Sequence, residues 1–254
     1  RDHVRYGPPR RDGSVPAPGE ALPHDGWQAS DAFSDVRFCG TCHQFSEDGY
    51  ALEGKLLENT VAEWRASRYA EEGVTCQTCH MPDRKHLWRG IHDPAMTRAG
   101  VTVEPLPVRL GDGSLQGGMV VRNTGTGHHF PTYLTPRVVF EGYQVDAAGN
   151  EVGDTRVEWW IARAVTLDLG RELFDSRVPA GGEVTLAYDK PRADRAEALL
   201  MRLRVEPDAF YTDFYRAMLE NATGAARADL ERALEASLAS HYILYEDRVA
   251  LPPP

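Results

Sequence analysis

The chain has 254 residues, a formal net charge of −10 and four cysteines. Hydrophobic residues make up 42% before glycine is counted. With glycine added and tyrosine removed, the share is about 47%, within the range of about 45–50% typical of globular proteins, which excludes a mainly disordered chain. Acidic residues outnumber basic ones by 38 to 28, which argues against duplex binding, because that binding depends on neutralising phosphates. No run of about 18 apolar residues occurs, so we predict no transmembrane segment.

Residues 1–30 are rich in proline and charge and show neither a helical nor a strand period. We predict an extended arm that carries His3 and His24. The chain begins at Arg1, without a start methionine or a signal peptide, and we interpret it as a processed form. The arm is either a linker or a segment that reaches a neighbouring chain.

All four cysteines fall in two C-x-x-C-H repeats, and C-x-x-C-H is the attachment motif of c-type haem. The first repeat holds Cys39, Cys42 and His43, and the second holds Cys76, Cys79 and His80. Two thiols at this spacing add across the two vinyl groups of one porphyrin, and the following histidine supplies the proximal imidazole. We therefore predict two covalently bound haem c groups.

Three other uses of two cysteine pairs are a four-cysteine zinc site, a redox dithiol and disulfides. None of them requires a histidine directly after the second cysteine. With nine histidines in the chain, chance would rarely place one at both positions. Because bacteria attach haem c outside the cytoplasm, we expect a periplasmic or extracellular protein whose signal peptide is not in this sequence.

Each iron needs a second axial ligand or keeps an open site, and both histidine and methionine can serve. Our first choices among the remaining histidines are His92 and His128, followed by His86 and then His24. Asp93 is placed to orient the His92 imidazole through its second nitrogen. Met96 stays as a thioether alternative.

His128 and His129 lie in a glycine-rich loop, residues 123–132, which follows the strand-like run 119–122. We predict that the glycines bring this backbone close to a flat ligand. The loop then presents one of the two histidines to an iron of the N-terminal part.

The expected secondary structure changes along the chain. Apolar spacing from Leu56 to Trp64 predicts a helix, with Asn59 or Thr60 as its cap and Gly73 as its end. Short runs separated by turn signals predict an antiparallel β-sandwich. The expected strands are residues 101–110, 115–122, 137–146, 157–167, 183–188 and 199–205. Residues 207–241 predict a helical hairpin with an apolar stripe in the core (Phe210, Phe214, Met218, Leu230, Leu234 and Leu238), and residues 242–251 predict a last strand.

The predicted fold class is therefore α+β, in four parts. Residues 1–30 form the arm, residues 31–100 an irregular and helical dihaem segment, residues 101–206 the sandwich, and residues 207–254 the helical hairpin and tail.

Four strings together resemble the bacterial multihaem c-type cytochromes, in which a haem-binding segment precedes a β-sandwich. They are residues 38–43, 76–82, 86–96 and 123–137. The resemblance covers roughly residues 30 to 250, and its narrowest element is the G-H-x-x-P-T motif at Gly127 to Thr132, which favours His128 over His129 as a ligand. It implies low-spin, bis-histidine haems and electron transfer. This chain departs from many relatives in carrying only two haem motifs, as expected of one link in a longer relay.

We therefore predict a dihaem electron carrier rather than an enzyme, with redox proteins, other cytochromes or copies of itself as partners. One alternative is a dihaem peroxidase or oxidoreductase with one open haem site. The other is a repeating subunit of a conducting assembly, in which an arm histidine meets a neighbour's haem. Only three of the 28 basic residues are lysines, and such a bias towards arginine suits haem propionates.

Overall fold

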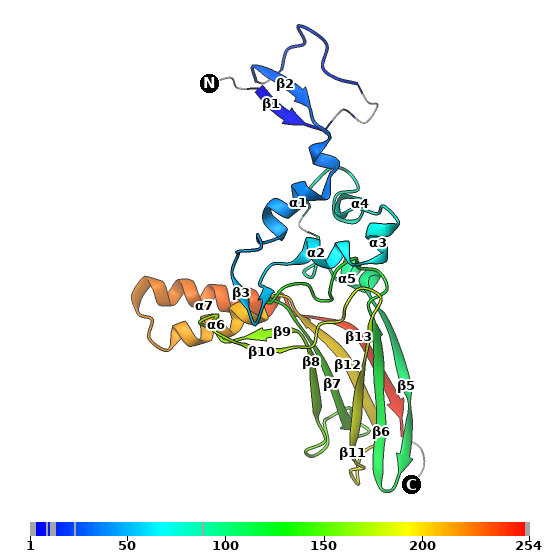
Figure 1. Ribbon diagram of the computed structural model, residues 1–254. Coiled ribbons are helices and arrows are strands. Elements are labelled where there is room, and N and C mark those ends of the chain that lie inside the picture. Colours follow the sequence, from blue (N-terminus) through cyan, green and yellow to red (C-terminus); the bar gives the residue numbers. More distant parts are fainter. Residues whose placement is uncertain (1–3, 9, 11–13, 23, 88, 252–254) are drawn as a thin grey trace.

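A computed structural model describes residues 4–8, 10, 14–22, 24–87 and 89–251. His3 of the predicted arm lies outside the described residues. The chain forms helices and antiparallel sheets, so the α+β prediction is confirmed. Figure 1 shows the arm at one end, the short helices next to it, and two long sheets at the other end. Within the described residues, none of the helices is both long and apolar enough to span a bilayer.

The arm contains a parallel pair of short strands, β1 (Val4–Gly7) and β2 (Gly26–Ala29), which the sequence did not predict. The next residues form the short elements that carry the haem motifs. They are η1 (Asp31–Ser34), α1 (Val36–His43), β3 (Ala51–Leu52), β4 (Lys55–Leu56), α2 (Thr60–Arg65), α3 (Arg68–Glu71), α4 (Cys76–His80) and α5 (Pro94–Gly100). The helix expected from residue 56 begins only at Thr60, because Leu56 pairs in β4, and it is divided into α2 and α3 at residues 66–67. It stops at Gly73 as predicted, since this residue has a φ of +70° that favours glycine.

Two antiparallel sheets follow. The first has the strand order β11-β6-β5, and the second has the order β13-β12-β7-β8. Their strands are β5 (Thr102–Gly111), β6 (Ser114–Arg122), β7 (Arg137–Val145), β8 (Val157–Ile161), β11 (Glu183–Pro191), β12 (Ala198–Glu206) and β13 (Tyr242–Ala250). The strand expected over residues 157–167 is interrupted at Ala162, and its second part, β9 (Arg163–Val165), instead pairs with β10 (Glu172–Asp175).

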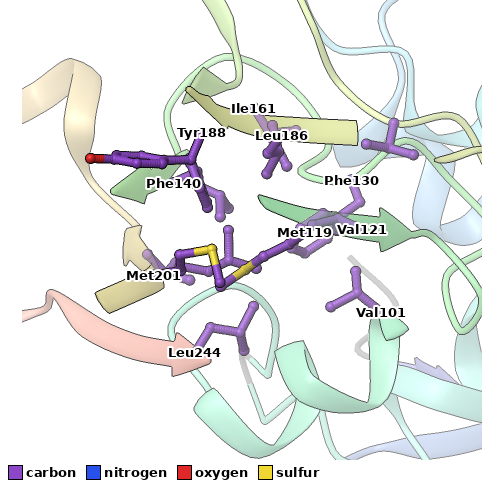
Figure 2. Close-up of a cluster of buried hydrophobic side chains, with 14 of the residues drawn as sticks. Val101, Met119, Val121, Phe130, Phe140, Ile161, Leu186, Tyr188, Met201 and Leu244 are labelled. Atoms are coloured by element: carbon purple, nitrogen blue, oxygen red, sulfur yellow. The ribbon is translucent and has the colours of Figure 1, made fainter. Parts of the chain in front are cut away.

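The two sheets share one hydrophobic core (Figure 2). Alternate residues of β12, such as Leu199, Met201 and Leu203, are fully buried, and they face Met119 and Leu186 of the other sheet. Burying such a side chain contributes about 1.5–3 kcal/mol, so this core dominates the stability of the chain. In contrast, the described part of residues 31–100 buries only three apolar side chains, Leu52, Leu57 and Val61.

The helical hairpin forms from α6 (Ala209–Leu219) and α7 (Gly224–Ala239), as expected, and it projects to one side in Figure 1. The predicted burial of its apolar stripe is wrong, since none of the six side chains is fully buried. Met218 is 48% exposed and Leu238 is 39% exposed. The helices meet through small residues instead, and the Thr212 hydroxyl donates a buried hydrogen bond to the Ser237 hydroxyl. Two residues after α7, the chain continues into β13, which belongs to the second sheet.

Candidate haem sites

The two C-x-x-C-H motifs lie side by side on α1 and α4. Asp35 caps α1 by accepting a hydrogen bond from the Arg37 backbone amide at 2.8 Å. The Gln77 side chain on α4 donates to the carbonyls of Phe33 and Asp35, both at 3.0 Å, which ties the two motif helices together. The two motif helices α1 and α4 also lie in contact with each other.

Both motifs are short helices, and this conformation suits their chemistry. In a helix, residues four apart lie on the same face, so the first cysteine and the histidine of each motif point to the same side. All four cysteines are free thiols, and burial raises the pKa of Cys76 to about 11. Neither pair forms a disulfide.

Each motif histidine faces one other histidine. The rings of His43 and His86 have centres 6.4 Å apart and planes 17° apart. The rings of His80 and His128 have centres 6.3 Å apart and planes 24° apart. His86 comes from the segment 81–92, which has no helix or strand among its described residues, and His128 comes from the loop after β6.

This spacing fits an iron between the two rings. Rings in direct contact would be about 3.5–4 Å apart, so each pair leaves a gap. An imidazole nitrogen binds a transition metal at about 2 Å, which places the centres of two imidazoles on opposite sides of one ion about 6 Å apart. The residues present therefore fit two haem groups. Cys39, Cys42 and His43 would hold one of them, and Cys76, Cys79 and His80 would hold the other.

Hydrogen bonds orient two of these imidazoles for metal binding. The Nδ1 atom of His80 lies 3.0 Å from the carbonyl oxygen of Arg89, and Nδ1 of His128 lies 2.8 Å from the carbonyl oxygen of His129. A carbonyl accepts only, so Nδ1 carries the proton and Nε2 is left with a free lone pair. Such a bond to the second nitrogen is the usual way in which a protein orients a metal-binding histidine.

Burial also keeps these imidazoles neutral, which is the form that binds metal. Desolvation lowers the pKa of His43, and the charge of His86 lowers it further. Desolvation is likewise the main cause of the lowered pKa of His80 and of His128.

The glycines of the 123–132 loop approach protein rather than an open space for a ligand. A Cβ atom on Gly125 would lie 2.0 Å from the carbonyl oxygen of Ala99 at the end of α5. A Cβ atom on Gly127 would lie 2.9 Å from the ring of Trp64 on α2. The loop is therefore packed directly on the haem-motif segment, and this contact brings His128 to His80.

Two charged residues that the sequence did not single out hold this loop. The Glu63 carboxylate accepts a hydrogen bond from the backbone amide of His129 at 3.0 Å and one from Arg177 at 3.0 Å. Arg177 also forms two hydrogen bonds with Asp175, at 2.8 and 2.9 Å. The arginine bias that suggested propionate binding is used here for buried ion pairs with protein carboxylates.

His92, a first choice from the sequence, lies elsewhere. Its Nε2 atom is 3.0 and 3.1 Å from the two carboxylate oxygens of Asp208, and its side chain is 53% exposed. Asp93 does not orient it, because Asp93 caps α5 by accepting from the amides of Ala95 and Met96. His24 remains on the arm, where its buried Nδ1 has no hydrogen-bond partner.

The four cysteines are not gathered into a zinc site. Across the described parts of the chain, which include all four cysteines, no group of three or more histidine, cysteine or acidic side chains is placed to hold a bare metal ion. The site consists instead of two histidine pairs, each with its own pair of thiols.

No protein-family model and no curated protein matches the sequence. Among solved structures, the chain is similar to a penta-heme cytochrome c552 from Thermochromatium tepidum, with a TM-score of 0.63 and 18% sequence identity. The match covers 93% of this chain and 61% of that one, so the chain spans less than two thirds of its neighbour's length. The fold of this chain is thus similar to that of this penta-heme cytochrome.

Proposed function

We propose that this protein is a dihaem c-type cytochrome that carries electrons between redox partners. The observation that carries the proposal is the pairing of each motif histidine with one histidine from a distant part of the chain, at 6.4 Å and 6.3 Å between ring centres. His86 and His128 are then the distal ligands. His86 takes the place of His92, which the sequence had favoured together with His128. Haem supplies reversible one-electron chemistry at its iron.

The side-by-side motifs support transfer between two groups within one chain. The motif helices α1 and α4 lie in contact, so the two porphyrins would attach close to each other. The motif helices are fixed to one another by Gln77, so the separation of the two sites is set by the fold.

A filled iron also favours a carrier over the peroxidase alternative. A peroxidase needs one iron with a vacant or displaceable position, whereas here both motif histidines face a second imidazole. Attachment of haem c further implies a periplasmic or extracellular protein, and its partners are other redox proteins.

The test is a haem count combined with EPR spectroscopy of the oxidised protein. We expect the mass of two haems and two low-spin signals, both of the rhombic type, because the planes of each imidazole pair are nearly parallel. Replacing His86 or His128 by alanine should each convert one haem to high spin while both stay covalently attached. A high-spin, cyanide-binding haem in the unmodified protein, oxidised or half-reduced, would support the peroxidase instead.

A further inference from the structure

Beside the second histidine pair lies a buried carboxylate that binding of the haem does not itself require. Glu63 is on α2, in the haem-motif segment, and its side chain is 4% exposed. Its partner Arg177 follows β10, in the β-domain, and is 5% exposed. Buried charges are costly unless they are paired and hydrogen-bonded. This ion pair therefore joins the haem-motif segment to the β-domain.

Both carboxylate oxygens of Glu63 are engaged, and most of their partners belong to one loop. Oε2 accepts from the backbone amide of His129 at 3.0 Å and from the Thr132 hydroxyl at 3.3 Å. Oε1 accepts from Arg177 at 3.0 Å and lies 3.4 Å from Nδ1 of His129. The carboxylate thus binds the loop directly after His128, the residue whose ring faces His80.

We propose that Glu63 is a positioning residue for the distal ligand of the second haem. Its carboxylate holds residues 129–132 so that His128 stays opposite His80 in both oxidation states. The inference rests on the proposed function, since it takes His128 as an axial ligand.

The charge of Glu63 matters as well as its shape. A negative charge held near an iron in a low-dielectric interior favours the oxidised state, which carries one more positive charge, and so lowers the reduction potential. Hydrogen bonds to a charged acceptor are also stronger than neutral ones. A glutamine keeps the size and one accepting oxygen but loses the charge, so Glu63→Gln separates these two effects from Glu63→Ala.

The experiment measures two properties of the holoprotein: the reduction potential of each haem, and the rate at which carbon monoxide binds after reduction. Carbon monoxide must displace the distal ligand, so its rate reports how often His128 leaves the iron. The haem affected by His128→Ala identifies which EPR signal belongs to the second site. The matched control is Glu141, also buried and paired with arginines, whose ion-pair partners Arg156, Arg202 and Arg204 all lie in the β-domain.

We expect Glu63→Ala to speed carbon monoxide binding at the second haem about tenfold, the factor that loss of a hydrogen bond to a charged group corresponds to. Glu63→Gln should raise the potential of that haem and leave the other haem nearly unchanged. Glu141→Gln should alter neither property.

The inference is overturned if both Glu63 variants match the unmodified protein in potentials and in carbon monoxide rate. If Glu63→Ala does not fold, the carbon monoxide rate of Glu63→Gln decides. A faster rate at the second haem supports the positioning role, and an unchanged rate overturns it even where the potential shifts. A different result, in which His128→Ala leaves both haems low-spin, would show that the ligand assignment itself is wrong.

Discussion

At the scale of single residues, replacing His92 tests whether His86 and His128, rather than His92, are the distal haem ligands. His92 is half exposed and pairs with Asp208, far along the chain from either motif. We expect His92→Ala to leave both low-spin haem signals unchanged in EPR. The lost hydrogen bond with Asp208 is half exposed and should cost at most about 1 kcal/mol in urea unfolding. A new high-spin signal in this variant would instead restore His92 as a ligand.

The lowered pKa of Asp175 predicts how the stability of the protein changes at acid pH. Burial would raise the pKa of its carboxyl group, but hydrogen bonds and charges from Arg177 and Lys55 outweigh burial and hold the pKa well below its usual value. A carboxyl whose pKa is lowered in the folded state stabilises the protein above its unfolded pKa of about 4. That contribution is lost as the pH falls below this value.

The measurement is urea unfolding of Asp175→Asn and the unmodified protein across a pH series. At neutral pH the variant should be less stable by about 3–5 kcal/mol, because a partner of a buried ion pair is removed. The difference should shrink steadily as the pH falls below about 4. A difference that is constant with pH would mean that the ion pair is not responsible.

The sequence could not choose between His86 and His92. The two lie six residues apart in one segment, and neither the local pattern nor the spacing shows which of them faces a haem. The choice depends on how the segment 81–92 folds back onto α1, which is a tertiary contact. His128 was easier to find, because the G-H-x-x-P-T motif marks it. Glu63 and Arg177 carry no local signal at all.

At the scale of elements, the long strands were predictable and the short elements were not. Alternating apolar residues over nine positions, as in β12, specify one buried face. Helix α5 has only seven residues and was missed, since so short a helix offers barely two turns of periodicity. The break at Ala162 was also missed, because the pairing of β9 with β10 is decided away from the local sequence.

The helical hairpin shows why an apolar stripe is not proof of burial. Its stripe has the correct helical spacing, yet Met218 and Leu238 stay largely exposed, and the contact between the helices uses Thr212 and Ser237. The sequence specified the helices through their spacing, but it did not specify whether another element covers them.

The helical hairpin lies between the paired strands β12 and β13, so its deletion can be tested. Val205 of β12 lies opposite Tyr242 of β13, so a short turn can join these strands directly. None of the shared core residues of the two sheets comes from α6 or α7. We expect replacement of residues 207–241 by a four-residue turn containing glycine to preserve the β signal in circular dichroism and both haem spectra. Loss of either would show that the hairpin supports the sheets or the haem sites.

At the scale of the whole molecule, the haem-motif segment depends on the β-domain. It buries only three apolar side chains of its own among its described residues, and it takes His128 from a loop of that domain. Packing of Gly125 on Ala99 and the ion pair of Glu63 with Arg177 join the two parts. The large core of the two sheets therefore supports a segment that has little apolar core of its own.

The net charge of −10 leads to a prediction about partners. The propionates of the two proposed haems would add further negative charge, so a basic redox partner should be steered towards this protein by long-range attraction. We expect the rate of electron exchange with a basic cytochrome to fall about tenfold or more from low to high salt, because at about 0.1 M salt screening already acts beyond roughly 10 Å. Stopped-flow absorption measures this rate, and an uncharged small reductant is the control, with little dependence on salt. A rate that rises with salt for the basic partner would show that docking uses a positively charged face instead.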